Sequence, residues 1–307
     1  MTASEISGMT VSATGGGSAS DVNPSGEKFN RTGDLSCGPR SFRRENRGDV
    51  ILWRFAHAPP GSNVVFTTRR GGVSRAPYES LNLGFHVNDS ALDVRRNRAI
   101  LARVLDLDPS RLTSPRQRHT ARVESLEDET LTGSGAAGEE SGFDPCDGLA
   151  TSLRGAPVLL HFADCVPVAL MGSGPSGKPV VAMLHAGRKG LMEGVIGSGV
   201  SLLTERYDMP PRGVTAAIGP AIGACCYRVG EEIGTAFESR FGPDVIARDG
   251  DGVRLDIRSA AKAALRQAGL ISGNIHVLRL CTGCDEDFYS YRREGVTGRH
   301  GAIAWIE

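Results

Sequence analysis

Three short apolar runs between residues 158 and 184 constrain the fold of this 307-residue chain most strongly. Val158–Leu160, Val166–Leu170 and Val180–Leu184 are bounded by Gly or Pro, and the segment MGSGPSGKP between the last two predicts a turn. Runs of this length are typical of strands that are buried on both faces, and they are too short for buried helices. The chain is therefore expected to contain at least one buried sheet.

Helical spacing of apolar residues appears elsewhere in the same chain. It predicts helices over Leu92–Leu105, Gly190–Tyr207, Gly230–Phe241 and Ile257–Ala268. Further strands are predicted at Ile51–Phe55, Val64–Thr68, Val214–Ile218, Ile275–Leu280 and Ala302–Ile306. Because strands and helices do not strictly alternate, the pattern favours a single α+β or mixed α/β domain over a doubly wound sheet.

Residues 1–47 differ in composition from the rest of the chain. Gly, Ser, Thr, Asn and Arg dominate them, and their few apolar residues have no periodicity. Such a segment cannot bury enough apolar surface to offset its ordering entropy. We expect a disordered tail over residues 1–47 and one catalytic domain over residues 48–307.

Charge and cysteine usage limit the partners and the compartment. Lys+Arg and Asp+Glu both number 35, so the formal net charge is zero and no basic surface for nucleic acid or membrane is expected. The seven cysteines are odd in number and no signal peptide or apolar span is recognisable. A cytoplasmic protein with reduced thiols and a small-molecule substrate is the consistent prediction; the sequence does not indicate an oligomeric state.

Two of the apolar runs end in chemically useful residues. Cys165 follows one run, His185 ends another, and His119 lies upstream in a polar loop. One Cys and two His can give zinc three protein ligands and leave the fourth position open, as in a catalytic site. Spacing alone supports this weakly, since residues so far apart are usually unrelated.

The remaining cysteines suggest less. Cys281 and Cys284 form a C-x-x-C pair, but no second such pair exists, so a structural four-cysteine zinc site is not expected. The adjacent Cys225 and Cys226 are interpreted as small buried hydrophobic residues.

Ordered motifs extend from residue 66 to residue 306. They include Phe66-Thr67-Thr68-Arg69, Ser80-Leu81-Asn82-Leu83-Gly84, Gln117 with His119, Asp147-Gly148, Ala163-Asp164-Cys165, His185-Ala186-Gly187, Cys225-Cys226-Tyr227, Ser290-Tyr291-Arg292-Arg293 and Thr297-Gly298-Arg299. In these motifs the chain resembles the laccase-domain family, also called the multicopper polyphenol oxidase or purine nucleoside phosphorylase family, which includes the bacterial peptidoglycan editing factor. The resemblance implies a four-layer α/β/β/α sandwich with mixed sheets between outer helices. It also implies that His119, Cys165 and His185 bind zinc, with copper as the other possible metal.

The resemblance further implies a zinc-dependent enzyme acting on purine nucleosides. It would cleave adenosine, inosine and methylthioadenosine with phosphate to the free base and ribose 1-phosphate, and a metal-bound water would deaminate adenosine. Arg69, in a Gly-rich turn, is the predicted phosphate ligand, and Arg292 or Arg299 near the C-terminus is the alternative. His86 and Asp164 are further catalytic candidates, although each also has a supporting role as an alternative. The chain departs from the family at Arg188, where an aromatic residue is usual, and that leaves the stacking of the substrate at this point open.

Two other activities remain open. A hydrolase that edits a peptidoglycan precursor could use the same metal, or Cys165 as a nucleophile with His185 as its base. A laccase-type oxidase needs on the order of ten histidines to hold four coppers. This chain has seven histidines, which leaves only weak copper-dependent oxidation of phenols.

Overall fold

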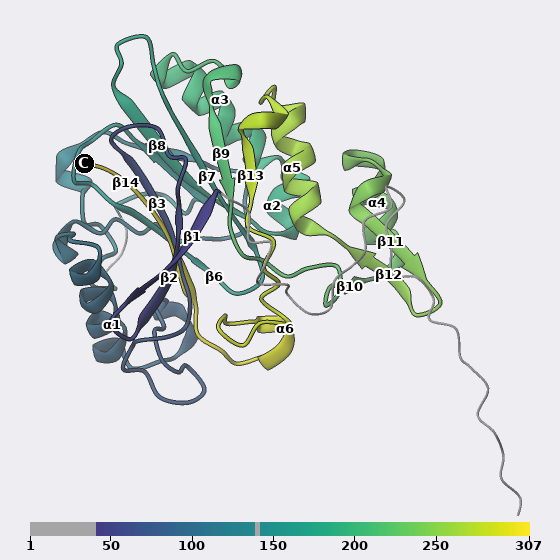
Figure 1. Cartoon of the computed structure of the whole chain (residues 1–307), viewed down its shortest axis with the longest axis horizontal. Helices are drawn as coiled ribbons and strands as arrows, with labels where there is room; N and C mark the ends of the chain where they lie inside the picture. Colours follow the sequence, from purple (N-terminus) through teal and green to yellow (C-terminus); the bar gives the residue numbers. More distant parts are fainter. Residues whose placement is uncertain (1–40, 139–141) are drawn as a thin grey trace, which may run out of the picture.

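The computed structural model describes residues 41–138 and 142–307, which form two stacked β-sheets with helices on the outside (Figure 1). The larger sheet has the order β13-β9-β7-β8-β5-β4 and the second has the order β1-β2-β3-β14-β6. The strands of the larger sheet are β4 (Glu124–Leu126), β5 (Gly148–Thr151), β7 (Val166–Ser173), β8 (Pro179–Ala186), β9 (Thr215–Ile218) and β13 (Ile275–Val277). Those of the second are β1 (Phe42–Arg47), β2 (Val50–Phe55), β3 (Ser62–Thr67), β6 (Val158–Phe162) and β14 (His300–Ile306).

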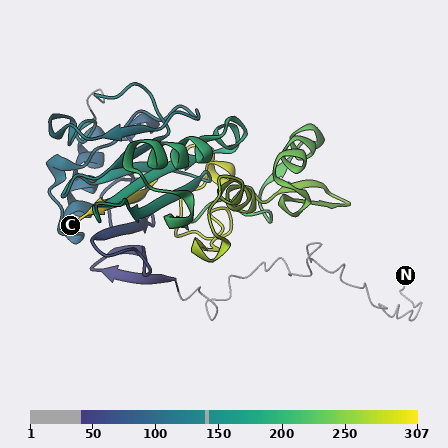
Figure 2. The ribbon, with the colours of Figure 1, turned by 90° about the horizontal axis from the view of Figure 1, so that it is seen from above.

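Within the described residues, six α-helices accompany the sheets. They are α1 (Ala91–Val104), α2 (Arg188–Glu193), α3 (Val195–Tyr207), α4 (Glu231–Phe241), α5 (Ile257–Gln267) and α6 (Tyr291–Glu294). α1 covers the outer face of the five-stranded sheet, whereas α2, α3 and α5 cover the outer face of the six-stranded sheet. α4 projects from the rest of the molecule with a small sheet of β10 (Arg228–Val229), β12 (Gly252–Leu255) and β11 (Ile246–Asp249) (Figures 1 and 2).

Three apolar layers hold the structure together, and strand alternation shows why. Val64 and Phe66 of β3 face the space between the two sheets, while Val65 between them faces α1. On β14, Ala304 and Ile306 likewise face the other sheet and Trp305 faces outward. Successive residues of a strand point to opposite faces, so each strand contributes to two layers. The four-layer sandwich is therefore confirmed.

The structure corrects the expected boundary of the tail. Phe42–Arg47 form β1 and pair antiparallel with β2, and the buried Phe42 joins the core between the sheets. Residues 42–47 consequently belong to the domain, because a paired strand with one buried aromatic residue does not need an apolar alternation along its whole length. Residues 1–40 of the predicted tail lie outside the described residues.

Two other details differ from expectation. The single helix predicted over Gly190–Tyr207 is two helices, which meet at Gly194 with its φ of +97°. The five-stranded sheet is antiparallel in each of its described pairs, whereas the six-stranded sheet is mixed. Within the two described ranges, none of the helices combines the length and apolar composition that a bilayer crossing requires.

Candidate active site

The strand register brings the predicted ligands together at the edge of the six-stranded sheet that is formed by the strand ends. β7 and β8 are antiparallel, with Val166 opposite Ala186, so Cys165 at the start of β7 lies beside His185 at the end of β8. β5 pairs antiparallel with β8 on the other side, which places Asp147 next to His185. The backbone N–H of His185 donates to the carbonyl of Asp147 at 2.7 Å.

Asp147 orients both histidines of the cluster. His185 Nδ1 lies 2.7 Å from Asp147 Oδ1, so the ring donates this proton and keeps Nε2 available as a ligand atom. The backbone N–H groups of Arg118, His119 and Thr120 also donate to the Asp147 carboxylate, at 2.7 to 3.1 Å. His119 adopts a left-handed φ of +60°, an uncommon conformation that these three hydrogen bonds support.

The cluster has the donor set and spacing of a metal site. The ligand atoms of His119, Cys165 and His185 all lie within 4.8 Å of one another, and His119 Nε2 is 3.7 Å from Cys165 Sγ. Bonds of about 2.0 Å to nitrogen and 2.3 Å to sulfur at a tetrahedral angle separate these atoms by roughly 3.6 Å. A Cβ on Gly187 would stand 2.9 Å from both Cys165 Sγ and the His119 ring, so the glycine leaves room at the cluster.

Mutual electrostatics favour a thiolate–imidazolium pair of Cys165 and His185, so a bound metal would have to displace the proton on His185 Nε2. Burial raises the pKa of the Cys165 thiol, but the His185 and His119 imidazoles outweigh it and lower the pKa to about 6. Burial lowers the pKa of His185, but the Cys165 thiolate and Asp147 raise it to about 9. A thiolate is the ligand form of cysteine and also its nucleophilic form, so the geometry fits both uses of Cys165.

His86 lies beside the buried His161. The His86 ring is 6.0 Å from that of His161, which accepts from Arg98 Nη2 at 2.9 Å. Partial burial, followed by the Arg299 and Arg98 guanidinium groups, lowers the pKa of His86 to about 4. His86 is therefore uncharged near neutral pH and presents a hydrogen-bonding ring without a proton charge.

Arg299 is a half-buried cation beside the cluster. Its Nη1 donates to the carbonyls of Thr297 and Gly298, each at 2.9 Å, and no carboxylate among residues 41–138 and 142–307 forms an ion pair with it. Burial lowers its pKa, whereas the nearby Cys165 and Asp164 raise it. A Cβ on Gly84 would meet Arg299 and His86 at 2.9 and 3.2 Å, so the two side chains are neighbours. A half-buried guanidinium with free donors is a binding group for an anion.

Asp164 holds the loop that carries Cys165. Its Oδ1 accepts from Thr282 Oγ1 and its Oδ2 from the backbone N–H of Arg292, each at 2.7 Å. Asp164 has a φ of +88°, so the backbone turns sharply immediately before Cys165. These contacts fit a positioning role for the carboxylate, which was the alternative to its predicted catalytic role.

Arg69 is already engaged within the protein. Its Nη1 forms an ion pair with Glu294 at 2.7 Å, its Nε donates to the carbonyl of Glu79 at 2.6 Å, and the guanidinium lies 4.5 Å from the centre of the Tyr289 ring. No described contact joins Arg69 to the cluster. These partners weigh against its predicted role in phosphate binding.

Sequence reasoning missed a second group of possible ligands. Cys225, Cys226, Cys281 and Cys284 place their four sulfur atoms within 4.8 Å of one another. The premise of the excluded four-cysteine site, that no second cysteine pair exists, does not hold, because the second pair is not another C-x-x-C motif but the adjacent Cys225 and Cys226. Sequence reasoning also missed Asp147 as a site residue, although Asp147-Gly148 is one of the motifs on which the resemblance rested.

Comparisons with known proteins agree with this geometry. The chain is 35% identical to the purine nucleoside phosphorylase YlmD of Geobacillus stearothermophilus over 269 residues, which cover 85% of this chain and 95% of that protein. It is 35% identical to the purine nucleoside phosphorylase Cgl2154/cg2365 of Corynebacterium glutamicum over 246 residues, with 79% and 93% covered.

Solved structures are also similar. The crystal structure of YlmD from G. stearothermophilus superposes with a TM-score of 0.80 at 33% identity, covering 88% of this chain and all of that one. The hypothetical protein YfiH of Bacillus licheniformis gives a TM-score of 0.80 at 31% identity, covering 87% of this chain and all of that one. The model of the family described as multi-copper polyphenol oxidoreductase laccase matches residues 63–307, and the chain belongs to this family.

Proposed function

We propose that this protein is a zinc-dependent purine nucleoside phosphorylase that accepts adenosine, inosine and methylthioadenosine and also deaminates adenosine. The names of its relatives support the substrate class. The observation that carries the proposal is the three-ligand cluster of His119, Cys165 and His185 beside an Arg299 without a described ion-pair partner. An ion held by the cluster would supply Lewis-acid chemistry when bound.

Arg299 is the group that we assign to phosphate. Its Nη1 is used by two backbone carbonyls, and its Nε and Nη2 have no partner among the described residues. Two parallel N–H donors match two phosphate oxygens, and such charge-assisted contacts are stronger than neutral ones. This assignment replaces Arg69, whose charge is balanced by Glu294.

Phosphorolysis needs one bond to form at C1′ of the ribose and one to break. An oxygen of the held phosphate attacks C1′, and the C1′–N9 bond breaks with its electron pair remaining on the purine, which then takes up a proton. Arg299 would hold the attacking phosphate, and the uncharged ring of His86 beside it would hydrogen-bond the substrate. Asp147 and Asp164 would position the cluster residues and not touch the substrate.

The laccase activity in the family's name finds less support in these residues. A three-copper cluster needs several neighbouring imidazoles, but only two of the seven histidines contribute to a group of possible ligands in the described residues. His57 and His276 stack on each other with ring centres 5.6 Å apart, outside that group. Oxidation of phenols is therefore at most a side activity of copper bound at the same His₂Cys set.

The deciding experiment incubates the purified, metal-loaded protein with inosine, with and without phosphate. We expect hypoxanthine and ribose 1-phosphate in equal amounts, only when phosphate is present. Adenosine without phosphate should yield inosine and ammonia. Hypoxanthine release that is indifferent to phosphate would identify a hydrolase instead. Absence of turnover of every nucleoside, together with cleavage of a peptidoglycan precursor, would favour the editing alternative.

A further inference from the structure

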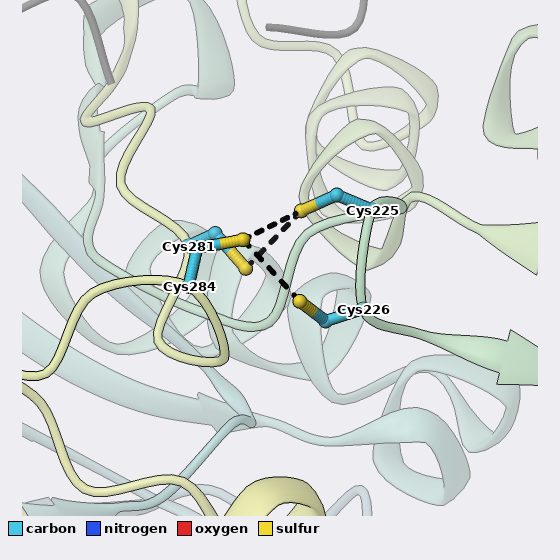
Figure 3. A group of neighbouring side chains, drawn as sticks. All are labelled: Cys225, Cys226, Cys281 and Cys284. Carbon is cyan, nitrogen blue, oxygen red and sulfur yellow. Dashed lines mark hydrogen bonds between the residues drawn. The ribbon is translucent and has the colours of Figure 1, made fainter. Parts of the chain in front are cut away.

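The four cysteines outside the active site converge on one point. Figure 3 shows the side chains of Cys225 and Cys226 from one loop directed towards those of Cys281 and Cys284 from another. Cys225 Sγ lies 3.4 Å from Cys281 Sγ and 3.3 Å from Cys284 Sγ, and Cys284 Sγ is also 3.3 Å from Cys226 Sγ. Two disulfides would divide the sulfurs into two exclusive pairs, whereas here Cys225 and Cys284 each contact two partners.

The sheet explains why two distant motifs meet. β9 and β13 are parallel neighbours, and their pairing resumes beyond both strands at Ala221 and Cys281. The backbone N–H of Thr282 donates to the carbonyl of Ala221 at 3.2 Å. The loop after β9 and the loop after β13 therefore leave the same edge of the sheet in register, and each brings two sulfurs.

Small residues allow the close approach of the loops. A Cβ on Gly283 would stand 2.9 Å from Cys226 Sγ, and a Cβ on Gly223 would stand 3.1 Å from Cys225 Sγ. The backbone N–H of Gly223 donates to Cys281 Sγ at 3.1 Å, a contact that stabilises negative charge on the sulfur. Both glycines thus bring backbone against the sulfur cluster.

Guanidinium groups surround the same two loops. Arg254 Nη1 donates to the carbonyl of Cys225 at 3.2 Å, and Arg258 Nη1 to that of Leu280 at 2.7 Å. Arg293 Nη1 donates to the carbonyl of Thr282 at 2.7 Å. The three guanidinium groups also pair with carboxylates, those of Asp249, Asp256 and Glu294, so they support the two loops through hydrogen bonds more than through unbalanced charge.

We propose that Cys225, Cys226, Cys281 and Cys284 bind a second zinc ion as a closed, structural tetrathiolate site. Zinc–sulfur bonds of about 2.3 Å give a tetrahedron with edges of roughly 3.8 Å. This length lies between the closest sulfur contacts of 3.3 Å and the 4.8 Å limit that encloses all four. With every position filled by protein, this zinc would stabilise structure and perform no catalysis.

The location of the site indicates what the zinc would stabilise. Cys226 stands two residues before β10, at the base of the projecting unit of β10–β12 and α4 (Figure 1). Thr282, between the two cysteines of the other loop, donates to the Asp164 carboxylate next to Cys165. The second zinc would therefore fix both the base of that unit and one support of the active site.

Metal counting on the full chain, purified under reducing conditions, tests the proposal. We expect two zinc ions per chain in the wild type, one in Cys281→Ser/Cys284→Ser, one in Cys165→Ala and two in the matched control Cys146→Ala, whose thiol is buried and belongs to neither group of possible ligands. Loss of zinc from the double variant does not depend on any enzymatic activity, so it is distinguishable from failure of the proposed function. An unchanged zinc count in the double variant would overturn the proposal.

A measurement without substitutions covers the case in which the double variant does not fold. X-ray absorption at the zinc edge should show about five sulfur ligands for every two zinc ions, because Cys165 adds one to the four. One sulfur per zinc, with a single zinc ion bound, would overturn the site. So would an intact mass that shows two disulfides, alkylation of Cys284 in the native metal-loaded protein, or iron in place of zinc.

Discussion

The two sulfur-containing clusters of this protein lie along one edge of one sheet but differ in almost every chemical respect. The ends of β8, β9 and β13 and the starts of β5 and β7 meet at this edge because β5 and β7 run antiparallel to the other three strands. The active-site cluster mixes one thiolate with two imidazoles, and the second cluster has four thiols and no imidazole. Three ligands leave a position for chemistry, whereas four of them close the coordination sphere.

The polar groups that surround the two clusters also suit different uses. Asp147 orients the imidazoles of the first cluster, and Arg299 and His86 beside it offer donors to a substrate. The guanidinium groups around the second cluster are bound to backbone carbonyls of its own loops. Proximity of Cys and His therefore does not distinguish a catalytic site from a structural one. What distinguishes them is whether polar groups around the ligands remain free to bind a substrate.

Removal of the one thiolate from the active-site cluster should have the largest effect on activity. Cys165→Ala removes one of three ligands, and loss of several kcal/mol of metal-assisted stabilisation corresponds to a decrease in kcat/KM of about 100-fold or more. The melting temperature should fall less than in a variant of the four-cysteine cluster, because structural zinc contributes to folding directly. Inosine phosphorolysis and thermal melts measure the two effects. Activity within a few fold of the Cys146→Ala control would contradict the assignment of Cys165.

Removal of the Arg299 guanidinium should lower phosphorolysis much more than deamination. A charge-assisted contact contributes roughly 1.5–3 kcal/mol, so Arg299→Ala should lower phosphorolysis of inosine about 10- to 150-fold. Deamination of adenosine consumes no phosphate and should decrease much less. In Arg69→Ala both activities should decrease by a similar factor, because loss of the ion pair with Glu294 disturbs the fold around the site. A selective loss of phosphorolysis in Arg69→Ala would instead restore Arg69 as the phosphate ligand.

Replacement of the carboxylate behind the histidines should weaken one cluster and spare the other. Asp147→Asn keeps the shape of the side chain but removes the charge that His185 and three backbone N–H groups contact. Loss of such a supporting partner typically lowers metal affinity about 10- to 100-fold. Competition with a chelator should show one zinc ion released more easily and the other unchanged, so the four-cysteine site serves as an internal reference. An equal decrease in affinity for both zinc ions would mean that Asp147 supports the fold in general.

The parts of the fold that can be predicted are those in which burial requires an apolar pattern in the local sequence. β6, β7 and β8 are buried on both faces, so they appear as uninterrupted apolar runs. β1 has the sequence FRRENR with only Phe42 buried, and nothing in that pattern distinguishes an edge strand from a polar tail. The two-residue β10 is too short to leave any pattern.

The site was predictable only in part for a related reason. The resemblance identified His119, Cys165 and His185, but what brings them together is the register of β7 against β8, which no local pattern encodes. The four cysteines meet through the parallel pairing of β9 and β13, whose loops are 56 to 59 residues apart in sequence. No local pattern indicates that the charge of Arg69 is balanced, because its partner Glu294 is 225 residues away.

The smallest expected effect concerns the contact that connects the two clusters. Thr282 is fully buried between Cys281 and Cys284, and its hydroxyl donates to Asp164 Oδ1 at 2.7 Å. Thr282→Val keeps the shape and removes the hydroxyl, so Asp164 loses one of the two bonds that fix the turn before Cys165. If loss of this hydrogen bond raises the activation free energy by about 0.5–1.5 kcal/mol, kcat should decrease roughly 2- to 12-fold.

Three further readouts distinguish positioning from a general loss of stability in Thr282→Val. The KM for inosine should change little, because Thr282 does not face the substrate, and both zinc ions should remain bound. Thr282→Ser restores the hydroxyl and should restore most of kcat, even if the lost methyl group lowers the melting temperature. If Thr282→Val keeps the wild-type kcat while losing stability, the four-cysteine cluster supports the fold alone. The two clusters would then be independent neighbours on one sheet edge, with no coupling through Asp164.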